Sequence, residues 1–320
     1  MNPLKPARKM ASRTYWQLRE YYRSGMIIRD RMLWRIKKWI RIHKGTLHPV
    51  VLEYKITPTP RYGWGKHSHP LVEAKLAEEK ECFHALFADF MELKDGIPNI
   101  PAERTGDAAQ PYWHNGWLGI LDSLSIYGFI AKRKPKHYFE IGSGNSTKFA
   151  HRAKLDYSPF TIITSIDPTP RAEIDALCDT IIRKPLESVD FDVFSSLTEG
   201  DVLFFDGSHY VFQNSDVTAF FLDVLPAIPP GVLIGFHDIF LPDDYPPSWR
   251  GRFYAEQYML ACLLINDPNR YKCIFPAHYI SLNARYQPII EAFKETTSTG
   301  VKEVSGTSFW IEKQPVLHRQ

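Results

Sequence analysis

Short apolar runs alternate with longer amphipathic segments over the second half of the chain. The apolar runs are rich in Val, Ile, Leu and Phe and lack polar–apolar alternation, which predicts buried strands. The predicted strands are 137–141, 161–167, 180–183, 201–206, 231–236, 271–275 and 307–311. The predicted helices are 71–93, 117–131, 146–154, 171–177, 217–225 and 254–265. This alternation favours an α/β fold whose parallel sheet is covered by helices on both faces.

The N-terminal part has a different pattern, in which aromatic and aliphatic residues are interleaved with Arg and Lys. Ile36, Trp39 and Ile40 in the stretch 15–42 fall roughly at helical spacing, which predicts a basic amphipathic helix. Residues 1–45 hold 13 Lys and Arg but two acids, a net charge of +11, so the rest of the +3 chain carries −8. Such a helix can cover the main domain, mediate self-association or lie on an anionic membrane surface. No nucleic acid partner is expected, because no RNA- or DNA-binding motif accompanies the basic residues.

Loops rich in proline and glycine divide the chain into parts. A stretch rich in Pro, Gly and His covers 57–70, and further prolines lie just before the helix predicted at 117–131. We therefore expect a basic N-terminal arm, a helical lead-in, the main α/β domain and a short tail. The expected boundaries are 1–60, 61–135, 136–314 and 315–320.

The composition is that of a globular protein from a reducing compartment. The 320 residues are 44% hydrophobic and 14% aromatic, and the four cysteines are scattered without a CxxC pair. A disulfide scaffold and a zinc site are therefore not expected. No apolar run reaches the ~18 residues that a membrane helix needs, and the first residues lack the apolar core of a secretory signal. We expect a cytoplasmic protein, peripheral to the inner face of the membrane if the arm binds lipid.

The stretch YFEIGSGNSTKFA (138–150) joins the first predicted strand of the main domain to a helix. In open parallel sheets, ligands bind beyond the carboxyl ends of the strands, and such a loop lies there. Its two glycines can adopt positive φ and allow close approach of a ligand, and the helix offers free N–H groups at its start. The loop residues expected to bind a cofactor are Gly142, Ser143, Gly144, Asn145 and Ser146. The dinucleotide fingerprint GxGxxG requires a glycine where this chain has Thr147, which disfavours NAD and FAD.

Two acids extend this expected pocket. Asp167 ends the second strand, where a carboxylate can bind the hydroxyl pair of a ribose. Glu140 ends the first strand and can attract a ligand's ammonium group, directly or through water. Acids on both sides of a glycine loop suit a nucleoside that bears an amino acid, such as S-adenosylmethionine. The alternative is structural, with an acid capping a turn that the glycines close.

Four motifs resemble those of a known family. FEIGSGNSTKFA (139–150), SIDPTPR (165–171), DVLFFDGSH (201–209) and PPGVLIGFHDIFLPDDYP (229–246) are similar to the successive motifs of class I S-adenosylmethionine-dependent methyltransferases. The resemblance covers about 112–313 and is strongest to the bacterial branch with DGSH and HD motifs, which includes sugar and natural-product O-methyltransferases. It implies a Rossmann-like sheet of seven strands in the order 3-2-1-4-5-7-6, with the last strand antiparallel. Ser146 stands where this family's motif usually has its last glycine.

The residues after the fourth and fifth strands supply candidate catalytic groups. An alcohol loses a proton as it attacks a methyl group, which calls for a base or a metal. His209 is the first candidate for the base, and His237 beside Asp238 is the second. Asp206 is expected to contact the cofactor, and Asp206 with Asp238 can also share a Mg²⁺ ion. The alternative for these residues is hydrogen bonding that holds the loops.

The acceptor, the molecule that receives the methyl group, is expected to bind beside the segments that surround the ends of the fourth and fifth strands. Acidic and aromatic residues of 240–249 are expected to face it, and the start of the helix at 254–265 faces either the cleft or the surface. The resemblance alone places Trp113, His114 and Asn115 near the methionine end of the cofactor. The predicted activity is methylation of a hydroxyl on a small molecule or glycan. Methylation of a nitrogen or carboxylate and a non-catalytic cofactor-binding module in surface-polysaccharide or natural-product assembly remain alternatives.

Overall fold

The computed structural model describes residues 36–44 except 38 and 41, residues 49–297 except 94, residue 301 and residues 303–315. The chain divides into two compact units between Thr57 and Pro58, and each is described by itself. Most of the predicted basic arm lies outside the described residues. Within the first unit, the described residues between 36 and 43 are helical, and Trp39 is 60% exposed. Among the residues that the structure describes, no helix is long and apolar enough to cross a membrane.

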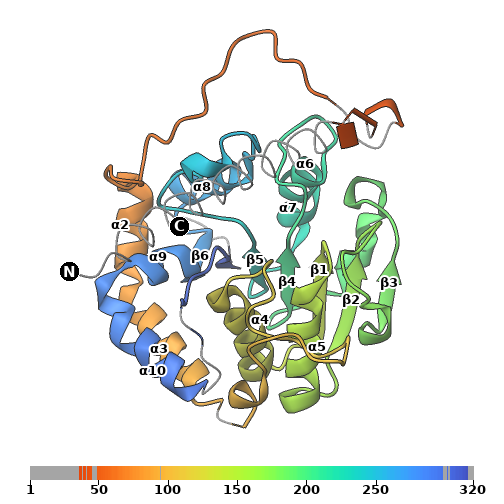
Figure 1. The fold of residues 1–320 in the computed structure, drawn as a ribbon, viewed down its shortest axis with the longest axis vertical. Coiled ribbons are helices and arrows are strands. Elements are labelled where there is room, and N and C mark those ends of the chain that lie inside the picture. Colours follow the sequence, from red (N-terminus) through yellow and green to blue (C-terminus); the bar gives the residue numbers. More distant parts are fainter. Residues whose placement is uncertain are drawn as a thin grey trace, which may run out of the picture. The chain divides into compact units, whose positions relative to one another are not determined.

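The second unit is built around a seven-stranded sheet with the order β3-β2-β1-β4-β5-β7-β6 (Figure 1). The strands are β1 His137–Ile141, β2 Ile162–Ile166, β3 Thr180–Ile182, β4 Val202–Phe205, β5 Leu233–Phe236, β6 Tyr271–Pro276 and β7 Phe309–Lys313. The first five strands are parallel, and β7 is antiparallel to both β5 and β6. The strand order and the antiparallel last strand are as predicted. All residues of β4 and β5 are buried, as their unpatterned apolar sequences require.

Helices surround this sheet. The α-helices are α2 Pro70–Glu78, α3 Lys80–Met91, α4 Ile120–Arg133, α5 Asn145–Tyr157, α6 Asp216–Ala219, α7 Leu225–Ala227, α8 Glu256–Asn266, α9 Ala277–Leu282 and α10 Gln287–Thr296. Figure 1 shows α4 and α5 side by side over the middle of the sheet, and α3 beside α10 toward its β6 edge. The helix α4 is buried along nearly its whole length, so the sheet and the outer helices share one core.

Three predicted helices differ from the structure. The helix predicted at 71–93 is two helices, because the backbone leaves helical geometry at Glu79 (φ −100°, ψ 7°). The helix predicted at 171–177 is wrong: only a 3₁₀ turn, η2 Asp175–Leu177, forms there, since so short a segment cannot offset the cost of helix nucleation. The helix predicted at 217–225 contains a π-helical segment, η5 Phe220–Val224, between α6 and α7.

The loop after β5 is fastened to a strap formed by residues 61–69. The carboxylate of Asp244 accepts hydrogen bonds from the backbone N–H groups of Arg61 (2.5 Å) and Tyr62 (3.1 Å). It also accepts one from the hydroxyl of Tyr258 (3.0 Å). Since these contacts use a carboxylate on a residue that is only 5% exposed, Asp244 serves to hold the strap.

Asp243 has a similar structural role. Its carboxylate accepts a hydrogen bond from the Ser68 hydroxyl (2.7 Å) and lies 3.3 Å from Nε2 of His278. A side chain at Gly63 would come within 2.3 Å of Asp243, so the strap passes close against the loop. The prediction that Asp243 and Asp244 face the substrate is therefore wrong. Their polarity indicated solvent or ligand, whereas a distant segment of the same chain supplies their partners.

We expect Asp244→Ala to lower the free energy of unfolding by about 2–4 kcal/mol, because it leaves two backbone donors without their acceptor. Urea unfolding followed by circular dichroism measures this change. The matched control is Asp223→Ala, at an exposed position without a hydrogen-bonded side chain among the described contacts, with an expected effect within about 0.5 kcal/mol. Equal effects of the two substitutions would show that the strap is not held in this way.

Candidate functional site

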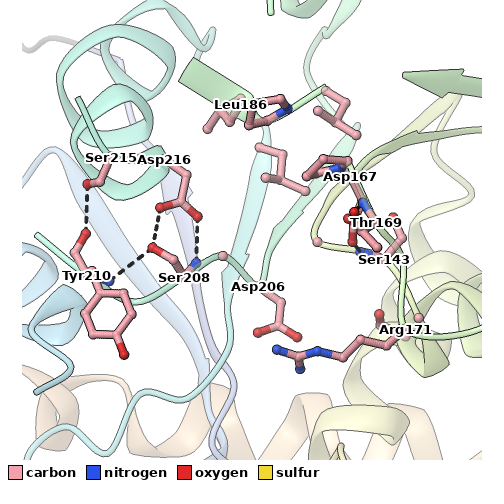
Figure 2. A pocket seen from close by; sticks show the side chains of 18 of the residues that line it. Ser143, Asp167, Thr169, Arg171, Leu186, Asp206, Ser208, Tyr210, Ser215 and Asp216 are labelled. Atoms are coloured by element: carbon pink, nitrogen blue, oxygen red, sulfur yellow. Dashed lines mark hydrogen bonds between the residues drawn. The ribbon is translucent and has the colours of Figure 1, made fainter. Parts of the chain in front are cut away.

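A cavity of about 480 Å³ opens at the carboxyl ends of the parallel strands (Figure 2). This volume lies within the range of small-molecule and cofactor sites. Its walls come from the loops after β1, β2, β3 and β4 and from the start of α6. The predicted cofactor residues that line it are Gly142, Ser143, Gly144, Asn145, Ser146, Asp167 and Asp206. The sequence therefore identified one wall of the cavity and the two acids beside it.

The two glycines of the loop have different roles. Gly142 has φ +80°, and a Cβ there would lie 1.8 Å from the carbonyl oxygen of Asp206, so only glycine fits. Gly144 has φ 174°, which is extended backbone, so the positive φ expected there is not found. A Cβ at Gly144 would meet nothing within 4 Å. Because Gly144 lines the cavity, a larger residue there would occupy space that is open to a ligand.

Asp167 joins the loops after β1 and β2. Its Oδ2 accepts a hydrogen bond from the backbone N–H of Ser143 (2.8 Å), and its Oδ1 accepts one from that of Thr169 (2.7 Å). Each carboxylate oxygen has a further lone pair. Asp167 can therefore hold the glycine loop and still accept hydrogen bonds from a ribose diol in the cavity.

Glu140 lies beneath the loop and does not line the cavity. Its carboxylate accepts hydrogen bonds from the hydroxyls of Tyr138 (3.3 Å) and Thr147, and the Thr147 oxygen accepts one from the N–H of Gly144 (3.1 Å). Burial raises the pKa of Glu140 to about 7. Direct contact with a ligand's ammonium group is therefore not what this position offers. Glu140 and Thr147 support the loop from inside the protein.

Trp113, His114 and Asn115, which the family resemblance places near the methionine end of the cofactor, do not line the cavity. Trp113 is 1% exposed and packs on Phe149 (ring centroids 5.5 Å apart), so it belongs to the core. Asn115 accepts hydrogen bonds from the backbone of Trp117 (3.0 Å) and Leu118 (2.8 Å). These last two residues line the cavity, whereas Trp113, His114 and Asn115 do not. The cavity wall here is therefore formed by Trp117 and Leu118, a few residues after the three that the resemblance indicated.

The candidate catalytic residues meet in a buried cluster at the tips of β4 and β5. His209 places Nε2 3.4 Å from Oδ1 of Asp206 and 3.5 Å from Oδ2 of Asp238. His237 places Nδ1 3.3 Å from the same Asp206 oxygen and 3.7 Å from Asp238. Each histidine is 4% exposed. Asp206 belongs to both the cavity wall and the cluster, so it connects the two.

Glu256 on α8 completes the surroundings of His209. Its Oε2 lies 2.7 Å from Nδ1 of His209, and the residue is fully buried. This contact fixes the imidazole ring with Nε2 directed at the two aspartates. The sequence did not decide whether the start of this helix, which includes Glu256, faces the cleft or the surface. Glu256 lies 47 positions from His209, so no local pattern pairs the two residues.

Asp122 on α4 lies within ion-pair distance of His237 on its other side, and it was not among the predicted site residues. Its Oδ2 lies 3.4 Å from Nε2 of His237, and its Oδ1 accepts hydrogen bonds from the backbone of Thr307 (2.7 Å) and Ser308 (2.6 Å). The one sequence signal was an acid three residues after Gly119 at a helix start, and its carboxylate accepts a hydrogen bond from the N–H of Gly119 (2.9 Å).

Carboxylates outnumber imidazoles in this cluster. Burial alone lowers the pKa of His209, but its hydrogen bonds with Asp206 and Glu256 outweigh burial, so its pKa lies well above the ordinary value. His237 behaves alike: Asp206 and Asp238 raise its pKa against the effect of burial. Burial raises the pKa of Glu256 to about 7. The surrounding carboxylates therefore favour the protonated form of each histidine.

The backbone at two of these residues is unusual. His209 has φ 64° and Asp238 has φ 58°, both in the left-handed region that non-glycine residues seldom adopt. The turn at His209 is held by a hydrogen bond from the N–H of Ala255 to its carbonyl (3.0 Å). Two such conformations at adjacent strand tips support a functional role, since strained backbone gathers at active sites.

Asp216 fixes the DGSH turn between Asp206 and His209. Its carboxylate accepts hydrogen bonds from the backbone N–H of Ser208 (2.6 Å) and from the Ser208 hydroxyl. The hydroxyl in turn accepts one from the N–H of Tyr210 (3.3 Å), as Figure 2 shows. The same view shows the side chain of Arg171 extending toward Asp206 across the cavity.

The fit of a metal ion depends on Asp206 and Asp238. Within the described part of the chain, no group of three or more His, Cys, Asp or Glu side chains is arranged to hold an ion. The two aspartates nevertheless converge on one point, Nε2 of His209. Mg²⁺ keeps several waters and needs few protein carboxylates. The shared Mg²⁺ site therefore stays a prediction.

Comparison with known proteins gives one family match. Residues 139–239 match the model of a methyltransferase domain family, which is roughly a third of the chain and extends from β1 to just beyond β5. No curated protein matches the chain at a significant level.

Several solved structures resemble the chain at low scores. The S-adenosylhomocysteine-bound methyltransferase PaMTH1 of Podospora anserina is 17% identical with a TM-score of 0.39, over 82% of this chain and 100% of that one. An O-methyltransferase of Bacillus cereus with bound S-adenosylhomocysteine is 12% identical with a TM-score of 0.31, over 76% and 100%. MycE of the mycinamycin pathway, with Mg, S-adenosylhomocysteine and mycinamycin VI, is 17% identical with a TM-score of 0.36, over 71% and 54%. Scores this low support no inference about function.

The family match and the observed sheet agree over the segment that contains the cavity. The matched segment contains the glycine loop, Asp167 and the tips of β4 and β5. The strand order is the one that the motifs imply for class I methyltransferases. Residues 139–239 match a methyltransferase domain, and the cavity residues suit S-adenosylmethionine as the cofactor: the acids Asp167 and Asp206, an open glycine backbone and a helix start.

We expect Gly144→Val to fold normally but to weaken binding of S-adenosylhomocysteine at least tenfold. Its extended backbone accepts a side chain, whereas the added methyl groups fill part of the cavity. Isothermal titration measures the dissociation constant, and thermal unfolding checks the fold. Gly106→Val is the control, because a Cβ there also meets nothing within 4 Å and Gly106 does not line the cavity. Unchanged binding in Gly144→Val would place the cofactor elsewhere.

Proposed function

We propose that this methyltransferase transfers a methyl group to a hydroxyl of a small molecule or glycan. The observation that carries this proposal is the fixed imidazole of His209. Its Nε2 lies 3.4 Å from Oδ1 of Asp206, and Asp206 lines the cavity. The motif resemblance to sugar and natural-product O-methyltransferases supports the same acceptor atom. A hydroxyl needs a proton acceptor as it attacks, and the cluster contains one in a fixed orientation.

In this proposal the chain's residues position and deprotonate the acceptor. S-adenosylmethionine supplies the electrophilic methyl carbon when bound, and in-line geometry accounts for much of the rate. Neutral His209 takes the hydroxyl proton on Nε2, while Glu256 accepts the hydrogen bond from Nδ1–H. Because the pKa of His209 lies above its ordinary value, the histidine must first lose a proton. Activity should therefore increase as the pH rises.

The carboxylates that raise the pKa of His209 also favour a second candidate function, because they stabilise the imidazolium form. An imidazolium ion accepts no proton, so the same site supports a non-catalytic module that binds the cofactor without turning it over. Transfer to a nitrogen or a carboxylate on the same scaffold needs no strong base and is a further alternative. All three alternatives retain the cofactor cavity, so only turnover with different acceptors separates them.

The basic arm suggests how the enzyme is placed in the cell. In the first unit, Ile36 (45% exposed) and Trp39 (60% exposed) present apolar side chains to solvent on the described helical residues. Together with the +11 charge of residues 1–45, this supports peripheral contact with an anionic membrane surface or self-association. All four cysteines are free, which supports a cytoplasmic location.

We expect His209→Ala to bind S-adenosylmethionine normally and to reduce turnover by roughly 10²–10⁴-fold, the usual contribution of a general base. The assay is methyl release with a panel of hydroxyl, amine and carboxylate acceptors. The wild-type rate should rise with pH through an apparent pKa above the ordinary 6.5 of histidine. Glu256→Gln removes one carboxylate that raises this pKa, so its profile should shift to lower pH. Unchanged turnover in His209→Ala would contradict the base role, and cofactor binding without turnover on any acceptor would favour the module.

Chelation should abolish activity if Asp206 and Asp238 share a Mg²⁺ ion, and added Mg²⁺ should restore it. A divalent cation would also lower the pKa of His209 by offsetting the carboxylates that raise it. The measurement is the rate with EDTA and after Mg²⁺ addition, with Asp238→Asn as the variant that should need far more Mg²⁺. Activity that survives EDTA would exclude an exchangeable metal and leave His209 as the base on its own.

A further inference from the structure

A row of aromatic side chains leads from the cofactor cavity past His209. Tyr210 and Phe212 line the cavity, with ring centroids 5.7 Å apart. The ring of Tyr254 lies 4.6 Å from that of His209 and meets Tyr210 edge-on at 5.6 Å. Trp249 meets Tyr254 at 5.8 Å. These four residues, Tyr210, Phe212, Trp249 and Tyr254, are called the aromatic platform.

An arginine rests on the outer end of this platform. The guanidinium carbon of Arg252 lies 3.7 Å from the ring centroid of Trp249 and 5.4 Å from that of Tyr254. Arg252 is exposed, and no carboxylate of the described residues lies within ion-pair distance of it. Stacking on the rings restricts the guanidinium plane. The result is a fixed positive charge whose hydrogen-bond donors remain available to an oxyanion.

Contacts through Tyr254 connect Arg252 to His209: the Arg252 guanidinium lies 5.4 Å from the Tyr254 ring, and that ring lies 4.6 Å from the His209 ring. Burial raises the pKa of Tyr210, and the positive charge of Arg252 acts in the opposite direction. Phe253 has φ 56°, a conformation that is strained for a bulky residue. This turn lets both neighbours of Phe253, Arg252 and Tyr254, contact the same Trp249 ring.

We infer that the aromatic platform and Arg252 bind an acceptor that has a ring and an oxyanion, a carboxylate or a phosphate. The inference rests on the proposed function. The acceptor ring packs on the platform, the oxyanion accepts hydrogen bonds from Arg252, and the hydroxyl to be methylated faces His209. Among glycans, this selects acidic or phosphorylated sugars over neutral ones.

The test compares matched probes on protein saturated with S-adenosylhomocysteine. p-Nitrophenyl β-D-glucuronide and p-nitrophenyl β-D-glucoside differ only in a carboxylate in place of a CH₂OH group. Isothermal titration should show the glucuronide binding roughly tenfold or more tightly, the usual size of a charge-assisted hydrogen bond. The 6-phosphate of the glucoside forms a third arm, and tighter binding of either anion supports the inference.

Arg252→Gln should remove the preference for the anionic probes and leave binding of S-adenosylhomocysteine unchanged. Arg250→Gln is the matched control, because Arg250 is also exposed and makes no contact with an aromatic ring, and it should retain the preference. Equal affinities in the wild type, a preference that survives Arg252→Gln, or no binding of any probe would overturn the inference. Failure of the wild type to bind S-adenosylhomocysteine would instead contradict the proposed function, so the two failures can be distinguished.

Discussion

The site depends on a close backbone contact between the loops after β1 and β4. Gly142 lies so near the carbonyl of Asp206 that a Cβ would come within 1.8 Å of that oxygen. The N–H of Asp206 donates to the carbonyl of Ile141 (2.8 Å), and the N–H of Gly142 donates to that of Ile166 (3.0 Å). The ends of three strands are therefore fixed together at one point. Because Asp206 also lies close to both histidines, this contact sets the distance between the glycine loop and the buried histidine–aspartate cluster.

The buried cluster is costly unless its charges compensate one another. Isolated buried carboxylates and imidazolium ions lose several kcal/mol of hydration each. Here each histidine lies between carboxylates from different elements. Glu256 of α8 lies beside His209, and Asp122 of α4 lies beside His237. The charges thereby tie α4 and α8 to the strand tips. The geometry that orients the imidazoles is thus the same geometry that makes their burial tolerable.

Patterns within short stretches predicted the sheet and one wall of the cavity. The strand β1 begins and ends at the predicted residues, and Gly142 and Asp167 line the cavity. Contacts between distant segments were not predictable. Glu256 is 47 positions from His209, and Asp122 is 186 from Ser308, so no local pattern pairs them. Asp244 was misinterpreted for the same reason, since the two backbone groups that it binds lie more than 180 positions away.

The predicted cofactor residues and the residues of the proposed acceptor surface lie mostly in separate parts of the chain. The family match ends at residue 239, whereas Trp249, Arg252 and Glu256 come after it. The turn that carries Arg252 and Tyr254 leads directly into α8, which begins at Glu256. A change in that turn would therefore affect both the acceptor surface and the orientation of His209. In the proposed function, acceptor choice and the position of the base would be coupled through this one short segment, which lies outside the matched cofactor motifs.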